Sequence, residues 1–167
     1  MKPIANSSVL IALSAIDRLD LLPRRFPDGI LVPRAVWREV VETGHGRPGA
    51  TAVQAAQWIT VSDTPPSSTL DLLRTELDDG EAEAIALALK QECTLVLVDE
   101  REARRAASRL GLSVLGTVGI LIWGRRAGLL PCLRSALDDL VGRGQFHLGS
   151  DVYASALRTV DEIPPSS

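Results

Sequence analysis

The sequence predicts an α/β protein in which a mostly parallel, twisted sheet is wrapped by helices. Short apolar runs alternate with helical patterns along most of the chain, and this alternation is typical of strands joined by crossover helices. A length of 167 residues, 46% of them hydrophobic and 23% charged, is enough for one globular domain and too little for two. We therefore expect a single domain over residues 1–163 and a frayed tail at 164–167.

The first half of the chain predicts three short strands and the helices between them. Cap residues at positions 6–8 follow the first apolar run, and apolar residues then recur at helical spacing through Ile16. Gly29 ends a second helical stretch, Pro33 suits the first turn of the next helix, and an alanine-rich helix follows a glycine-containing loop. The expected elements are strands at 3–5, 30–32 and 59–61 and helices at 9–16, 19–26, 33–43 and 50–58.

The second half opens with a loop rich in proline and serine at 65–68, which is too short to separate two domains. The clearest buried strand lies at 94–98, because no polar residue interrupts it between Leu95 and Val98. The helices around it carry apolar residues at helical spacing. The expected elements are strands at 94–98 and 113–115 and helices at 70–77, 80–92, 101–110, 117–127, 131–141 and 151–160.

Composition excludes several classes of protein. A net charge of -3 and a pI of about 5.4 exclude a protein that holds nucleic acid by bulk positive charge alone. Two cysteines are too few for a disulfide scaffold, and the longest apolar run, at 118–123, is far shorter than the ~20 residues of a membrane helix. We therefore expect a cytoplasmic protein with no membrane association, whose cysteines and tryptophans are packing residues.

Polar side chains occur where two predicted strands end. Asn6 follows the first strand and Asp99 follows the strand at 94–98, and ligands of parallel sheets gather beyond such carboxyl ends. Asp99 has a structural alternative, because it could cap the helix that begins near Glu100.

Two further carboxylates stand at unusual positions on helices. Glu39 lies close to the apolar stripe of its helix, where a charge needs a partner; an ion pair with Arg38 or another basic residue would provide one. Glu81 begins a helix that is otherwise nearly all alanine, leucine and isoleucine. The neighbouring acids Asp78 and Asp79 are explained by helix capping and the helix dipole.

If these positions converge, several carboxylates and one amide share a small volume, and their repulsion requires a divalent cation. A ligand set made only of oxygens fits Mg²⁺ or Mn²⁺. Such an ion activates water and stabilises charge on a phosphoryl oxygen, which is the chemistry of phosphodiester hydrolysis.

The four positions lie within short sequence segments that are spread along nearly the whole chain. They are the segments 4–11, 19–23, 32–40, 79–88, 97–101 and 116–119, which read IANSSVLI, LDLLP, VPRAVWREV, DGEAEAIALA, LVDER and GTVG. With these blocks the sequence resembles the PIN-domain nucleases, particularly the branch close to VapC-like toxins of toxin–antitoxin pairs.

The resemblance implies a PIN-like fold with a metal-binding set at Asn6, Glu39, Glu81 and Asp99, the three acids being catalytic, and an accompanying hydroxyl at Ser8. Most active PIN nucleases have aspartate at the position of Asn6, although this branch often carries asparagine. The amide can still ligate Mg²⁺, but the site loses one negative charge, and charge count tunes its affinity for hard cations.

Arginines near this set predict where RNA would bind. Arg101, Arg104 and Arg105 lie on neighbouring faces of the helix that follows Asp99, and guanidinium groups suit phosphate. The alternative is a solvated helix face paired with Glu100 and Glu102.

The leading hypothesis is a Mg²⁺- or Mn²⁺-dependent ribonuclease toxin that cleaves RNA, is inhibited by a cognate antitoxin protein and forms a homodimer. The alternative is a weak or silent PIN-like module, with Asn6 in place of the first acid, that binds RNA or a protein partner. A phosphate receiver or an aspartyl phosphatase on a similar sheet would explain Asp99. Both fail, because neither the paired acids nor the Asp-x-Asp that they need follows the first strand.

Overall fold

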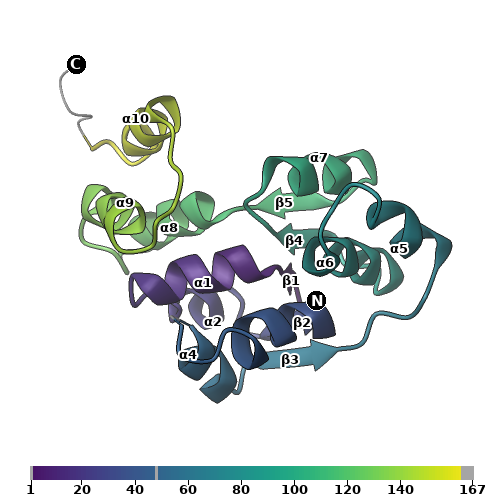
Figure 1. The fold of residues 1–167 in the computed structure, drawn as a ribbon. Coiled ribbons are helices and arrows are strands. Elements are labelled where there is room, and N and C mark those ends of the chain that lie inside the picture. The colour runs from purple at the N-terminus through teal and green to yellow at the C-terminus, as the bar shows by residue number, and fades with distance from the viewer. Residues whose placement is uncertain (1, 48, 163–167) are drawn as a thin grey trace.

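The computed structural model describes residues 2–47 and 49–162, and in this part of the chain helices surround a parallel five-stranded sheet (Figure 1). The strand order is β3-β2-β1-β4-β5, and every neighbouring pair is parallel. The strands are β1 (Ile4–Ala5), β2 (Ile30–Pro33), β3 (Ile59–Ser62), β4 (Leu95–Leu97) and β5 (Ser113–Leu115). The α/β class and the five strands predicted from the sequence are confirmed.

Helices account for most of the remaining chain. They are α1 (Ser7–Ala15), α2 (Leu21–Arg25), α3 (Arg34–Trp37), α4 (Ala50–Ala55), α5 (Ser68–Leu73), α6 (Asp79–Lys90), α7 (Arg101–Arg109), α8 (Thr117–Arg126), α9 (Leu133–Gly142) and α10 (Ser150–Thr159), with a π-helical turn η1 (Arg38–Glu42) directly after α3. Each predicted helix is present, most of them shorter by one to four residues at an end. The predicted tail at 164–167 lies outside the described residues.

The core lies on both faces of the sheet. Successive strand residues point to opposite faces, so Val96 and Val98 pack among α5, α6 and α7, whereas Leu97 packs with α1, α2, α8, α9 and α10. Both layers are built from fully buried aliphatic side chains, with alanines where α6 approaches the sheet. The three tryptophans pack at the edge of the layer that contains Leu97, as predicted, and both cysteines are free.

The predicted helix at 33–43 differs from the observed one. It begins as α3 after Pro33 but continues as the π-helical turn η1, which the amide of Thr43 closes by donating to the carbonyl of Arg38, five residues earlier, at 2.6 Å. Such turns contain one residue more than an α-helical turn and are frequent at functional sites. Hydrophobic periodicity at 3.6 residues cannot reveal them.

Helix starts follow the expected cap chemistry in α5 and α6. The Ser67 hydroxyl accepts from the amide of Leu70 at 3.0 Å. Asp78 and Glu81 form the predicted capping box, each side chain accepting a hydrogen bond from the other's backbone amide. Asp79 instead pairs with Arg74 at 3.2 Å.

Among the described residues, no helix combines the length and apolar character needed to cross a membrane.

Candidate functional site

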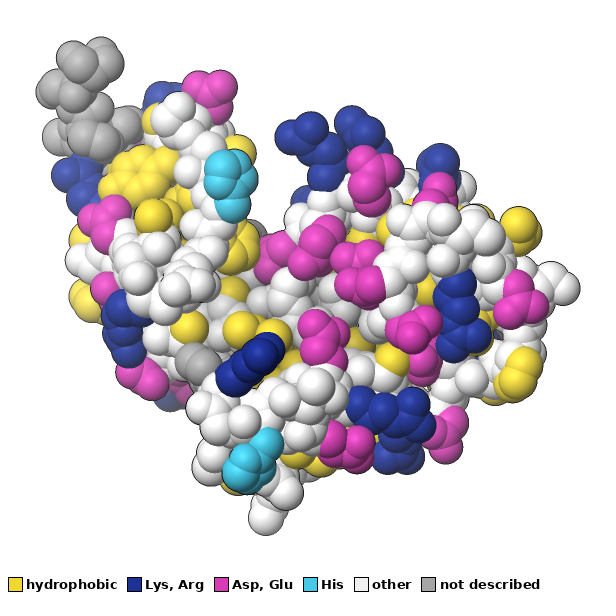
Figure 2. All heavy atoms as spheres, in the orientation of Figure 1, with side chains coloured by type: hydrophobic (Ala, Val, Ile, Leu, Met, Phe, Trp, Pro, Cys, Tyr) yellow, Lys and Arg dark blue, Asp and Glu magenta, His cyan; other side chains and the backbone are white. Residues whose placement is uncertain are grey.

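A cleft of about 1030 Å³ opens beyond the carboxyl ends of β1 and β4. These strands pair in parallel with Ala5 opposite Leu97, so the residues that follow them, Asn6 and Asp99, meet at one edge of the sheet. The amide of Asn6 donates to the carbonyl of Leu97 at 2.9 Å and fixes this approach. Figure 2 shows the face hollowed here, with acidic side chains gathered in the hollow between the C-terminal helices and α7.

Asn6 lies beneath the floor of the cleft with only 2% of its surface exposed. Its Nδ2 donates to Oε2 of Glu100 at 3.4 Å, while its Oδ1 is buried and has no hydrogen-bond partner among the described residues. An unpaired buried acceptor destabilises a protein by about 1–3 kcal/mol. The amide oxygen of Asn6 is therefore an unused ligand atom.

Glu39 reaches the same place from η1. Its Oε2 accepts a hydrogen bond from the hydroxyl of Ser7 at 2.8 Å, and its side chain borders the cleft. The expectation that Glu39 lies near an apolar stripe with a basic partner is wrong, because the residue is exposed toward the cleft and hydrogen-bonded to serine. The π-helical turn buries Val40 and Val41 in succession and leaves Glu39 outside the core.

Gly80 lies close to both of these groups. A Cβ atom at Gly80 would lie 3.2 Å from Oδ1 of Asn6, 3.4 Å from Cγ2 of Val36 and 3.6 Å from Oε2 of Glu39. The unpaired amide oxygen and one carboxylate oxygen thus lie against the same glycine, where any side chain would crowd them.

Glu81 is the buried acid of the site, with 8% of its surface exposed. Its pKa is raised from 4.5 to about 7, chiefly by burial and also by the negative charges of Asp78, Glu100 and Glu39, against the opposing hydrogen bond from the backbone of Asp78. The electrostatic influence of Glu39 and Glu100 shows that acids from three separate segments of the chain share this region.

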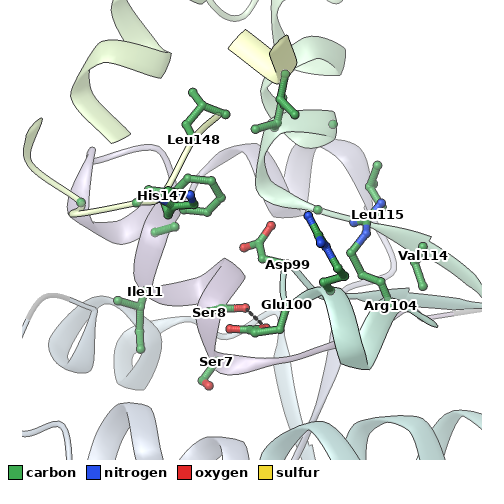
Figure 3. Close-up of a pocket in the computed structure, with 18 of the residues that line it drawn as sticks. Ser7, Ser8, Ile11, Asp99, Glu100, Arg104, Val114, Leu115, His147 and Leu148 are labelled. Carbon is green, nitrogen blue, oxygen red and sulfur yellow. Dashed lines mark hydrogen bonds between the residues drawn. The ribbon is translucent and has the colours of Figure 1, made fainter. Parts of the chain in front are cut away.

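Glu100 is a site residue whose only expected role was an ion pair with a nearby arginine. Its Oε2 accepts hydrogen bonds from Nδ2 of Asn6 at 3.4 Å and from Oγ of Ser8 at 3.2 Å, and its side chain lines the cleft (Figure 3). The one available signal was its position next to Asp99, since either of two consecutive acids at a strand end can face the cleft.

Asp99 lines the same cleft but is bound to α8. Its Oδ1 accepts from the amide of Thr117 at 2.8 Å and its Oδ2 from the hydroxyl of Thr117 at 2.7 Å. Burial raises the pKa of Asp99, and the Thr117 hydrogen bonds and the charge of Arg104 offset only part of the rise. The alternative that Asp99 caps a helix is therefore correct, but the helix is a different one. Asp99 caps α8 and not the helix that follows Glu100.

The arginines of α7 border a second hollow of about 670 Å³. Arg101 and Arg104 line both this hollow and the main cleft, whereas Arg105 lines the second hollow only and pairs with Glu102 at 3.5 Å. Arg104 also donates to the carbonyl of Val98 at 3.0 Å, which holds its guanidinium beside Asp99. The predicted positive rim therefore adjoins the acidic floor.

The donor set at the cleft is chemically suited to a hard cation. Glu39 and Glu100 line the cleft, Asn6 and Glu81 are buried nearby, and all four can offer oxygen ligands. The unpaired Oδ1 of Asn6 is the observation that favours such a ligand. Within residues 2–47 and 49–162, no three acids, histidines or cysteines are gathered tightly enough to form a metal-binding group by themselves.

Comparison with known proteins identifies the family. A family model described as a PIN domain matches residues 2–162. No characterised protein and no solved structure gives a significant match. PIN domains are generally metal-dependent nucleases and usually use divalent ions such as Mg²⁺. The match spans nearly the whole chain and agrees with the parallel sheet and the acid-lined cleft at its carboxyl edge, and the chain belongs to the PIN-domain family.

Proposed function

We propose that this protein is a Mg²⁺- or Mn²⁺-dependent ribonuclease of a toxin–antitoxin pair. The observation that carries the proposal is the unpaired, buried Oδ1 of Asn6, which lies beside Gly80 together with a carboxylate oxygen of Glu39, at the cleft of a PIN domain. An amide oxygen beside several carboxylates is an arrangement that a divalent cation stabilises and that repulsion otherwise disfavours.

Asn6, Glu39 and Glu81 would hold the ion, and Glu100 is a better fourth donor than Asp99. Glu100 hydrogen-bonds Asn6 directly and influences Glu81, whereas both oxygens of Asp99 are directed at Thr117 in α8. Asp99 would then act as a positioning residue that ties the start of α8 to the floor of the cleft. When bound, the ion supplies an activated water and stabilises charge on a phosphoryl oxygen.

The other residues of the cleft would bind and orient RNA. Arg101 and Arg104 border the acidic floor and would contact phosphate oxygens through charge-assisted hydrogen bonds. Ser8 donates to Glu100 and would hold that carboxylate toward Asn6. Affinity would come from these few groups, in keeping with the net charge of -3.

The toxin assignment rests on the resemblance to VapC-like toxins and on the acidic character of the cleft. A basic side chain from an antitoxin would complement the floor formed by Glu39, Glu81 and Glu100. A homodimer belongs to the same proposal, and light scattering of the purified protein tests it.

Incubation of the purified protein with a labelled single-stranded RNA in Mn²⁺, Mg²⁺ or EDTA tests the proposal. We expect cleavage that requires the metal and falls at least about a hundredfold in Glu39→Gln and Glu100→Gln. His45→Ala is the matched surface control, because His45 is exposed and lines neither hollow. Inducible expression of the wild type should arrest bacterial growth, and expression of Glu39→Gln should not. Cleavage without metal would contradict the metal dependence, and unimpaired growth with the wild type would contradict the toxin role.

The amide at position 6 supports a second candidate function. With asparagine in place of an acid, the cleft carries one charge fewer toward a cation, and a chain with this site could bind RNA without cleaving it. Calorimetric titration with Mn²⁺ separates the two functions, since a silent module would release no binding heat.

A further inference from the structure

The connection between α9 and α10 forms the wall of the cleft opposite the acids. Residues 144–149 all line the cleft, and Figure 3 shows His147 and Leu148 on one side of the opening with Asp99 and Arg104 across from them. The fold brings this segment to the site from the far end of the chain.

The segment is held in place from below. The amide of Phe146 donates to the carbonyl of Leu140 at 2.9 Å, and the side chains of Phe146 and Leu148 are half-buried against the core. Gln145 adopts a left-handed backbone conformation, with φ 51°, which turns the chain directly after α9. His147 is exposed and lines the cleft, and its two neighbours, which pack against the core, hold it in this position.

We propose that Phe146, His147 and Leu148 form a shelf that binds a nucleobase of single-stranded RNA beside the phosphodiester to be cleaved. The base would stack on the imidazole ring of His147 against the apolar surface of the shelf. This inference rests on the proposed nuclease function and names the residues that would set its base preference.

A nucleotide matches the two walls of the cleft better than a purely apolar or purely ionic ligand. Asp99, Arg101, Arg104 and Val114 line both the main cleft and the arginine hollow, so the two form one continuous path. A strand on this path would place phosphates on the arginines and a base on the opposite shelf. Single-stranded RNA is recognised in this way, with cationic side chains along its backbone and rings that stack on its bases.

The shelf combines surfaces that suit a base. Ile11, Val118 and Val152 add apolar contact to the same cleft, and Val152 is 51% exposed at its edge. The imidazole ring adds a π-face for stacking and ring nitrogens that can hydrogen-bond the edge of a base. A phosphate alone could accept a hydrogen bond from the imidazole but would use neither its π-face nor the apolar surface.

Binding and cleavage of short labelled oligoribonucleotides test the shelf. Binding is measured by fluorescence anisotropy in EDTA and cleavage in Mn²⁺, with one set of RNAs that differ in a single base and one RNA that lacks that base. We expect His147→Ala to weaken binding and raise KM by about 5- to 100-fold, with kcat little changed, because stacking on one base contributes in this range. His147→Phe should restore most of the binding, and His45→Ala should match the wild type.

The abasic RNA identifies the ligand. It should bind the wild type about as weakly as the intact RNA binds His147→Ala, and the variant should bind both RNAs equally. Unchanged binding, KM and base preference in His147→Ala would overturn the shelf and would point to a protein segment as the occupant of this wall. If the wild type neither binds nor cleaves RNA, the proposed function itself fails; cleavage by the wild type with an unaffected variant removes only the shelf.

Discussion

Asp99 accepts two hydrogen bonds from Thr117, one from its amide at 2.8 Å and one from its hydroxyl at 2.7 Å. The pair joins the end of β4 to the first turn of α8, eighteen positions later in the chain. It fixes the direction of α8 and thereby the position of the helical layer behind the cleft. An acid at the edge of the cleft thus has a structural role that can be measured apart from the proposed catalysis.

We expect Asp99→Ala to lower the stability of the metal-free protein by about 1–3 kcal/mol, because the amide and hydroxyl of Thr117 lose their acceptor. In a chain of this size the melting temperature should fall by roughly 3–10 °C. Thermal unfolding in EDTA measures the change, and Thr117→Val, which removes the hydroxyl bond alone, should show a smaller loss. An unchanged or higher melting temperature would mean that relief of charge repulsion outweighs the lost cap.

Because Glu81 is buried with a raised pKa, we expect the protein to become less stable as the pH rises. The pKa of Glu81 is raised from 4.5 to about 7, so between these values the folded state binds a proton that the unfolded state has released. This contribution is fully present below pH 4.5 and is lost as the pH rises through 7. Because part of the group is screened by solvent, we expect a decrease of about 1–2 kcal/mol between pH 5 and pH 8.

Glu81→Gln should remove this pH dependence while keeping an acceptor for the amide of Asp78. Urea unfolding in EDTA at pH 5, 6.5 and 8 measures it, with Glu42→Gln, an exposed acid outside the cleft, as the control. Equal slopes in Glu81→Gln and the wild type would show that another group titrates.

Gly80→Ala should impair metal binding by crowding the oxygens of Asn6 and Glu39. The added Cβ would lie 3.2 Å from Oδ1 of Asn6, closer than ordinary van der Waals contact, and 3.6 Å from Oε2 of Glu39. We expect Mn²⁺ affinity to fall at least about tenfold, by calorimetry, and melting in EDTA separates the cost of the close contact from the loss of the ion. Gly142→Ala is the matched control, since a Cβ there meets nothing within 4 Å. Unchanged Mn²⁺ binding in Gly80→Ala would place the ion elsewhere.

Asn6→Asp should lower the stability of the metal-free protein and raise its affinity for metal. Without metal, the new charge is buried beside Glu39, Glu81 and Glu100, so the melting temperature should fall. With Mn²⁺, the added charge should tighten binding by about tenfold or more and raise RNase activity. Melting in EDTA and in Mn²⁺ measures both effects on one sample, and a variant that is destabilised equally in the two buffers would argue against the site.

Much of the fold could be predicted because its signals are local. The apolar run at 94–98 and the periodic alanines of α6 determine a buried strand and a helix packed on the sheet, and the capping box at Asp78 and Glu81 sets where that helix begins. Because β1 and β4 are parallel, Asn6 and Asp99 lie at the same edge of the sheet irrespective of the loop conformations.

The site could be predicted only in part, because its details depend on directions and distant contacts. Spacing alone does not tell which of Asp99 and Glu100 turns toward Asn6, and that choice is made by Thr117, which holds Asp99. The approach of His147 depends on how α9 and α10 pack onto α8, which no local pattern encodes.

The extra residue in η1 makes the length of this helix a constraint on evolution. The turn is closed by the amide of Thr43, which donates to the carbonyl of Arg38 five residues earlier, while Val40 and Val41 are buried and Glu39 bonds to Ser7. Deleting one position between Arg38 and Glu42 would remove this bond and turn the flanking side chains by about 100° around the helix axis, so that either a valine or the carboxylate would lose its place. Length variation in this protein should therefore accumulate in the loops and be purged from this single turn.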